Sequence, residues 1–457
     1  MKKLLVVLLS LGLIVAFSMT ASAADVKFGG SYYVVGVYGN NPSLSDNGYS
    51  HAFFYQRVRL QPVFQIAEGL TFTARMDALE KQWGNTNWKG GTDDLSLSRP
   101  TVPVTTPKRG TQENIEFERG YVTFMTGIGQ FQVGYQNVDD WGTEFGDYSN
   151  SRPRIMYATK VGNLNLIATY EKVYESDTAG LAPYSNKVDA DNDTYALSGI
   201  YKDKGTEAGL LYKYYAYNSN KPAGAKTLMT QLSPYAKITA GPLYFEGEAT
   251  YWFGKTAQYE PPAPAAAKDV DLNAWSLYLK GKMNAGAGYV GALFSFASGN
   301  DLSDDTKNTT APSGGGIIMN PALLLLNDVM NTWTGGISAS SPGLSAANPV
   351  TSSKYNTVIY NAFAGFNPNP KLNVEAALTY ATVDKKALSK TAGVVTDAVS
   401  NKLGTEFDVK ATYKIYDNLT YMVGAGYLWT GDYFKGASTT ATVANDYVLL
   451  NQLTLSF

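Results

Sequence analysis

Apolar and polar residues alternate strictly over many segments of this chain, and this alternation limits what the chain can fold into more than any other feature. In residues 372–380 the alternate positions Leu372, Val374, Ala376, Leu378 and Tyr380 are apolar, and the positions between them begin with Asn373 and Glu375. Residues 406–415 repeat the pattern. Successive side chains of a strand point to opposite faces, so a strand separates the two sets, whereas a helix would mix them. The pattern therefore predicts strands.

About eighteen such segments follow one another between Ala24 and Phe457. We predict strands at 26–38, 51–67, 70–82, 113–127, 130–137, 153–161, 163–175, 193–202, 205–218, 228–240, 242–257, 271–284, 286–298, 354–367, 371–384, 403–416, 418–431 and 446–457. The connections alternate between tight turns, such as Glu68-Gly69, and longer loops rich in Gly, Ser, Asn, Asp and Pro. Short periplasmic turns alternating with long extracellular loops are typical of transmembrane β-barrels, which have an even strand number in bacteria.

The N-terminus has the features of a secretory signal peptide. Lys2 and Lys3 precede an apolar run over 4–17, and the small residues of 21–23 precede the expected cleavage site. No apolar run of 18 residues follows, so any membrane span must consist of strands. A sheet satisfies its backbone hydrogen bonds in hydrocarbon only by closing on itself. We therefore predict a signal peptide at 1–23 and an all-β, transmembrane antiparallel β-barrel of about 18 strands at 24–457, located in the bacterial outer membrane.

The composition excludes several kinds of protein. The chain has no Cys and only one His, His51, so it lacks the residue sets that bind zinc, haem or iron–sulfur clusters. It has no GxSxG motif and no second histidine for a catalytic triad. Its formal net charge of −2 argues against nucleic-acid binding. We therefore expect no enzyme, no cofactor and no metal centre. Acidic pairs such as Asp93-Asp94 and Asp304-Asp305 are expected to be loop residues that are solvated or bind divalent cations loosely.

Arginine is confined to the first third of the chain, and none occurs after residue 154. Two of the arginines, Arg99 and Arg109, lie in a predicted loop. The other six are predicted to form a basic wall of a pore: Arg57, Arg59, Arg75, Arg119, Arg152 and Arg154. All but Arg152, which lies at a strand end, share the parity that faces the lumen in the predicted register. A planar, permanently charged guanidinium suits a fixed wall that steers anions. Ion pairs with Asp77, Glu116 or Glu118 that only stabilise the wall are the alternative.

The loop after the fifth predicted strand is acidic and contains Asp139, Asp140, Glu144 and Asp147. We predict that these four residues form an acidic rim opposite the arginines. A solvated surface turn, or a weak cation site, is the alternative. A second loop, 299–353, contains an apolar island at 321–333. The island is expected either to form a short helix folded into or over the pore or to pack on other loops as a surface lid.

Residues 113–170 resemble the corresponding segment of the general porins of Gram-negative bacteria. The resemblance rests on Arg119-Gly120-Tyr121-Val122, Val133-Gly134-Tyr135-Gln136 and Glu144-Phe145-Gly146-Asp147. It implies that the acidic loop folds into the barrel, where its acids face the arginine cluster. It also implies a homotrimer, in which a loop like 83–112 holds a neighbour, and 16 strands as an alternative to 18. The terminal Phe457 resembles the C-terminal signature that the barrel-assembly machinery reads in outer-membrane proteins.

The sequence therefore predicts an outer-membrane porin, a water-filled channel for passive diffusion of small hydrophilic solutes and ions. Outer-membrane lipid, lipopolysaccharide and the assembly machinery are the expected partners. Two other functions remain open. One is a substrate-specific channel for carboxylates or oligosaccharides. The other is a surface or scaffold barrel for an exported partner such as a cytochrome.

Overall fold

The computed structural model describes residues 25–83, 115–147, 149–175, 190–219, 224–260, 267–312, 319–327, 337, 344 and 353–457. The predicted signal peptide, Arg99, Arg109, Asp93-Asp94 and nearly all of the predicted latch loop 83–112 lie outside these residues.

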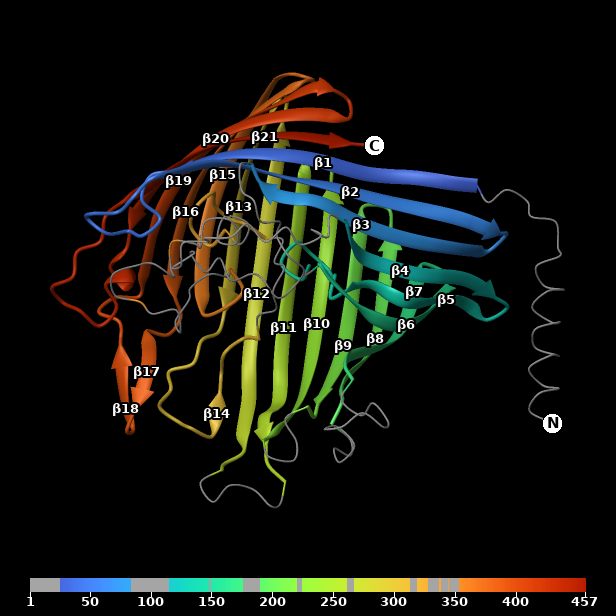
Figure 1. The fold of residues 1–457 in the computed structure, drawn as a ribbon, viewed down its shortest axis with the longest axis horizontal. Coiled ribbons are helices and arrows are strands. Elements are labelled where there is room, and N and C mark those ends of the chain that lie inside the picture. Colours follow the sequence, from blue (N-terminus) through green and yellow to red (C-terminus); the bar gives the residue numbers. More distant parts are fainter. Residues whose placement is uncertain are drawn as a thin grey trace, which may run out of the picture.

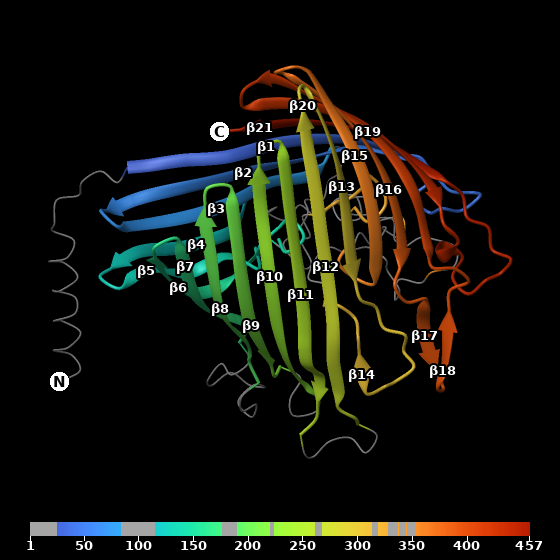
Figure 2. The ribbon, with the colours of Figure 1, turned by 180° about the vertical axis from the view of Figure 1, so that it is seen from behind.

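The described chain forms one closed barrel (Figure 1). Its strands are β1 (Asp25–Gly39), β2 (His51–Ala67), β3 (Leu70–Gln82), β4 (Ile115–Thr126), β5 (Gly129–Val138), β6 (Asn150–Val161), β7 (Leu164–Tyr174), β8 (Asn192–Asp203), β9 (Thr206–Tyr217), β10 (Lys226–Ala240), β11 (Leu243–Gln258), β12 (Val270–Ala285), β13 (Gly288–Ala297), β15 (Thr357–Asn369), β16 (Leu372–Val383), β19 (Lys402–Tyr416), β20 (Leu419–Thr430) and β21 (Asp446–Ser456). Neighbours in this order pair antiparallel, and β21 pairs with β1 to close the sheet. Figure 2, which views the barrel from behind relative to Figure 1, shows β8 to β12 side by side.

The predicted fold class is confirmed, since the barrel among the described residues has eighteen strands. The alternative of 16 strands is wrong. Every predicted strand is present, and no predicted boundary differs from the structure by more than three residues. The sequence does not predict four short elements in the loops: β14 (Lys307–Asn308), β17 (Ala387–Thr391) and β18 (Val394–Asp397), which form a hairpin, and the 3-10 helix η2 (Asp432–Lys435). None of the helices in the described ranges has the length and apolar character needed to cross a membrane.

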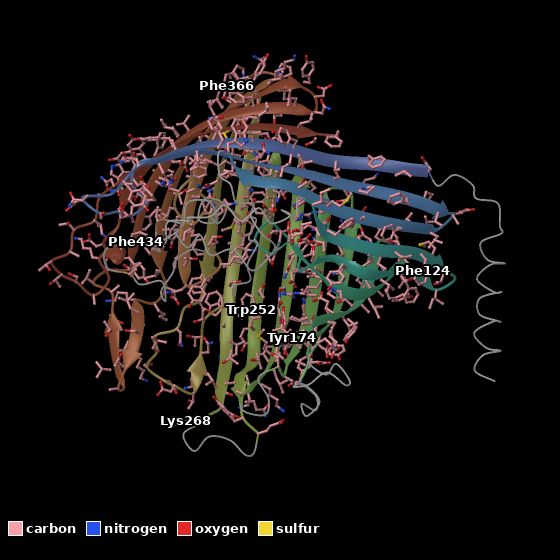
Figure 3. All side chains as sticks on the ribbon, in the orientation of Figure 1. Phe124, Tyr174, Trp252, Lys268, Phe366 and Phe434 are labelled. Atoms are coloured by element: carbon pink, nitrogen blue, oxygen red, sulfur yellow. The ribbon has the colours of Figure 1, made fainter. Side chains whose placement is uncertain are left out.

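The two faces of the barrel wall differ as the alternation predicts. On the outside, Leu378 and Phe407 are 49 % and 43 % exposed, whereas Thr379 and Glu406, each one residue away, are fully buried inside. Aromatic rings gather on the outside near the short turns, where Phe124 stacks on Phe131. Figure 3 shows Phe124 near this end. A large exposed apolar surface is costly in water and favourable in hydrocarbon, so this exterior suits a bilayer.

In the part of the chain that the structure describes, the β5–β6 loop and a segment of the long loop fold into the barrel and pack against its inner face. The first is the β5–β6 loop, residues 139–149. The second is the inner segment, which we define as residues 319–327 of the connection between β13 and β15. Apolar residues of both loops belong to a buried cluster with lumen-facing residues of the wall, among them Phe145, Leu324, Leu325, Ile359 and Leu428. The core of this barrel therefore lies inside its lumen.

Candidate functional site

The six predicted wall arginines all lie on strands that border the lumen, and three of them surround one carboxylate. Arg59 binds Asp77 through two hydrogen bonds, of 2.7 Å from Nε to Oδ1 and 2.6 Å from Nη2 to Oδ2. Nη2 of Arg75 lies 3.3 Å from the same Oδ2, and Nη1 of Arg57 lies 3.7 Å from it. Asp77 is only 3 % exposed. We call Arg57, Arg59 and Arg75 the first basic group.

The first basic group carries more positive than negative charge. Its second acidic partner is Glu80, whose Oε1 lies 3.3 Å from Nη1 of Arg57. Arg57 also lies over the ring of Tyr33, with 4.9 Å between Cζ and the ring centroid. The predicted alternative of ion pairing with Asp77 is thus present in the structure, and it holds the guanidinium groups in place. The side chains of Arg57 and Arg59 nevertheless remain 24 % exposed to the lumen.

A second basic group, Arg152, Arg154 and Lys213, surrounds Asp139 and Glu171. Nη1 of Arg152 lies 3.2 Å from Asp139 Oδ2, and Nη1 of Arg154 lies 3.8 Å from Glu171 Oε1. Lys213 Nζ contacts both acids, at 2.6 Å from Asp139 Oδ1 and 2.9 Å from Glu171 Oε2. No sequence motif marks Lys213 or Glu171, although the alternation along their strands places both side chains inside the barrel.

Arg119 lies between the two groups and has neutral partners. Its Nη2 donates to Asn137 Oδ1 at 2.6 Å and to Ser149 Oγ at 3.0 Å. Within the described ranges no carboxylate lies within ion-pair distance of its guanidinium, so its charge is less compensated than that of the other wall arginines.

The β5–β6 loop leaves the wall between β5 and β6 and attaches to β10, β11 and β12 (Figure 1). Trp141 Nε1 donates to the backbone oxygen of Ser233 at 3.0 Å. The backbone N–H and the hydroxyl of Thr143 both donate to Glu248 Oε2, each at 2.9 Å. Phe145 stacks on Tyr278, with 5.5 Å between the ring centroids. The loop therefore crosses part of the lumen and narrows it.

Glycine makes this attachment possible at two points of the loop. A Cβ atom on Gly142, whose φ is +64°, would lie 2.4 Å from Glu248 Oε2. A Cβ atom on Gly146 would lie 2.1 Å from the Trp141 carbonyl oxygen and 2.4 Å from Glu248 Oε1. Because Glu248 is buried, the loop wraps around its carboxylate at a distance that only glycine allows.

The four acids of the loop do not form one rim opposite the arginines. Asp139 joins the second basic group. Glu144 instead accepts hydrogen bonds from the Tyr278 hydroxyl at 2.6 Å and from Lys280 Nζ at 2.9 Å, both on β12. Asp140 interacts electrostatically with Arg119 and Arg154. The expectation of a common rim is therefore wrong for Glu144, because the loop turns its side chain to the far wall.

Asp147 has the most unusual environment of the four. Burial raises its pKa to about 6, and the nearby charge of Asp140 adds to this increase, while Lys237 and Lys354 oppose it. Lys354 Nζ donates to the backbone oxygen of Asp147 at 2.7 Å. Lys354 belongs to the connection that also carries the inner segment, so the two inward loops touch each other.

The apolar island of the long loop lies inside the barrel as far as it is described. Residues 319–327 contain no helix, and Leu324, Leu325 and Leu326 are buried. A surface lid is therefore wrong for these residues, and so is a helix. The remainder of the island lies outside the described residues.

A cavity of about 430 Å³ remains between the β5–β6 loop and the wall. The second basic group lines one part of it, and Tyr215, Tyr217 and Trp252 line another. Figure 3 shows Trp252 in the middle part of the barrel. The described residues hold no set of three His, Cys, Asp or Glu side chains that could bind a metal ion.

No family model and no curated protein matches this chain. Among solved structures, Pseudomonas aeruginosa OccK2 (OpdF) is 11 % identical over 95 % of this chain and 98 % of its own length, with a TM-score of 0.48. The anion-selective porin from Comamonas acidovorans is 12 % identical over 95 % and 100 %, with a TM-score of 0.44. P. aeruginosa OpdK with vanillate is 11 % identical over 94 % and 99 %, with a TM-score of 0.48. The fold assignment rests on the strand pairing of this chain itself.

Proposed function

We propose that this protein is an outer-membrane porin, a water-filled channel through which small hydrophilic solutes and ions diffuse passively. The observation that carries the proposal is a closed barrel with an apolar exterior and a charged lumen narrowed by an inward loop. A closed antiparallel sheet satisfies the backbone in a bilayer, and a charged interior holds water. The signal-peptide pattern at 1–23 supports export to the outer membrane.

Selectivity would arise from the distribution of charge around the narrow zone. The proposed basic side consists of Arg57, Arg59, Arg75, Arg119, Arg152 and Arg154. The proposed acidic side consists of Asp139, Asp140 and Asp147 of the β5–β6 loop, whereas Glu144 of the same loop pairs with Lys280 on the far wall. Fixed charges of opposite sign across a narrow pore orient dipolar solutes and disfavour apolar ones, which cannot replace the water they lose.

The experiment that tests the proposal is single-channel recording of the purified protein in a planar bilayer. We expect steady conductance and a reversal potential in a salt gradient that reports the sign of the preferred ion. Neutralising Arg119, the wall arginine with no described carboxylate within ion-pair distance, should shift the reversal potential toward cations. A protein that inserts but conducts no ions would contradict the proposal, and an unchanged reversal potential would contradict the role of the arginines.

A second candidate is a substrate-specific channel for carboxylates or oligosaccharides. It is favoured by the cavity, whose lining includes four cationic side chains and several aromatic rings. Guanidinium groups bind carboxylates in a planar fork, and aromatic faces pack on sugar rings. Permeation that saturates with one solute class would favour this candidate, and permeation that depends on size alone would exclude it.

Phe457 takes part in closing the barrel. The backbone N–H of Phe457 donates to Gly30 O at 3.0 Å, and Gly30 N–H donates to Phe457 O at 2.7 Å, so the last residue completes the closing strand pair. We propose that the barrel-assembly machinery reads Phe457 and that outer-membrane lipid and lipopolysaccharide surround the barrel. We also propose a homotrimer, to be tested by the mass of the detergent-solubilised particle.

A further inference from the structure

The lumen face of β15 to β20 differs from the rest of the wall, because its half nearest the long loops carries a group of apolar residues beside buried polar ones such as Thr379 and Glu406. The apolar residues there are Ile359, Ala381, Val383, Leu403 and Leu428, and all five are buried. The strands from β2 to β9 instead present the arginines, Lys213 and their acidic partners to the lumen. Water would wet an open apolar wall unfavourably, so this half of the wall is suited to a permanent cover.

The inner segment provides that cover. Leu325 is only 1 % exposed and belongs to the same buried cluster as Ile359 and Leu428. The carbonyl oxygen of Pro321 accepts hydrogen bonds from Asn361 Nδ2 and Thr379 Oγ1, both at 3.1 Å. The segment is thus bound to β15 and β16 through its backbone as well as through its side chains.

Glu406 of β19 binds the backbone of the inner segment through its buried carboxylate. Its carboxylate is fully buried, and its two oxygens accept the backbone N–H groups of Leu324 and Leu325, each at 2.7 Å. Buried N–H groups of a loop need a partner, and a buried carboxylate needs donors. The backbone N–H groups of the loop and the carboxylate of Glu406 therefore satisfy each other's hydrogen bonds in this buried place.

The two inward loops together cover a continuous part of the lumen. Lys354 Nζ reaches the backbone oxygen of Asp147, and its ammonium also lies 5.6 Å from the ring centroid of Phe145. The β5–β6 loop rests on β10 to β12, and the inner segment rests on β15, β16 and β19. The cavity of about 430 Å³ beside the second basic group is not covered by these contacts.

We infer that Glu406 is a positioning residue that holds the inner segment as a fixed plug over the lumen face of β15 to β20. The plug confines permeation to the side of the arginines. The consequence for permeation rests on the proposed channel function, whereas the seating of the plug does not depend on it.

Thiol labelling tests directly whether Glu406 holds the inner segment against the wall, because the natural chain has no cysteine. A single Leu325→Cys substitution should react slowly with a water-soluble maleimide in the folded barrel. Adding Glu406→Ala removes both acceptors and should speed the reaction about tenfold or more. Glu406→Gln keeps the shape of the side chain and one acceptor oxygen, so it should increase the labelling rate less. It replaces Glu406→Ala in the test if the alanine variant does not fold.

Glu375→Gln is the matched control, because Glu375 faces the lumen from β16 but pairs with Lys410 at 2.9 Å and with the Tyr289 hydroxyl at 2.7 Å. It should leave the labelling rate of Leu325→Cys unchanged. An intact barrel, judged by its mobility in unheated detergent gels, is required of each variant. If Glu406→Ala in an intact barrel labels no faster than the parent, the inference is overturned.

Bilayer recording then tests the effect on permeation. Glu406→Ala should raise the single-channel conductance and admit larger polyethylene glycols than the parent channel, and Glu375→Gln should not enlarge the polymer cut-off. Faster labelling with an unchanged conductance and polymer cut-off would overturn the confinement of the pathway. A parent protein without conductance would overturn the proposed channel function, while the labelling rates would still decide the role of Glu406.

Discussion

At the scale of single residues, Asp147 gives the lumen a charge that changes near neutral pH. Its pKa of about 6 lies above its usual value, because burial and Asp140 disfavour the charged form. We expect the preference for cations to increase as the pH rises from about 5 to 7, since deprotonation adds a negative charge beside the pathway. Reversal potentials at both pH values measure this change, and Asp147→Asn should abolish most of it.

The raised pKa of Asp147 also makes stability depend on pH. This dependence runs opposite to that of a salt-bridged acid, whose pKa is lowered. A raised pKa means that the folded barrel keeps the proton that the unfolded chain has already lost, so the contribution of Asp147 to stability is greatest at low pH. It is lost as the pH rises toward about 6. Asp147→Asn should remove this contribution to the pH dependence of unfolding.

Gly146 is a second residue with a specific requirement, since its missing side chain lets the loop lie against Glu248. Gly146→Ala would place a methyl group 2.4 Å from Glu248 Oε1, and overpacking of this kind typically costs about 1–3 kcal/mol. We expect the β5–β6 loop to leave its seat, with higher conductance and more open-channel noise. Gly127→Ala is the control, because no atom lies within 4 Å of the added methyl group. If the two variants had equal conductance and equal open-channel noise, the requirement for glycine at position 146 would be contradicted.

At the scale of elements, the β2–β3 hairpin acts as a unit because Asp77 ties its arginines together. Asp77→Asn removes the charge that three guanidinium groups share. We expect a shift of the reversal potential toward anions and a loss of about 1–3 kcal/mol of stability, which is below the value for fully buried pairs because Arg57 and Arg59 are partly exposed. Asp271→Asn, at an exposed ion pair with Lys255, is the control and should leave both quantities nearly unchanged.

At the scale of the whole molecule, the barrel depends on keeping charge off its outer face. Leu378 lies on the outer face in the middle part of β16. Leu378→Arg should destabilise the barrel in a bilayer by about 2–4 kcal/mol. Gln132→Arg, at a lumen-facing position of β5, should cost much less. Folding into liposomes under a urea gradient measures both variants, and equal costs would mean that the assigned faces are wrong.

The sequence by itself determined the strands, their order and the face each side chain takes. This was possible because the alternation in segments such as 372–380 is local and its cause is uniform, with hydrocarbon on one side of every strand and water on the other. The same rule placed Arg57 and Arg59 inside. It also identified the loops that follow each strand, although the hairpin of β17 and β18 was missed because its strands are only five and four residues long.

Only the tertiary structure decided where the inward loops attach. Thr143 and Glu248 are 105 residues apart, and Leu324 and Glu406 are 82 apart. Whether such residues meet depends on the closure of the barrel and on the path of a loop across its lumen, and no local pattern encodes either. Lumen-facing glutamates look alike in sequence, so Glu248 and Glu406 could not be told from Glu375 until the closed barrel placed a loop backbone against two of them.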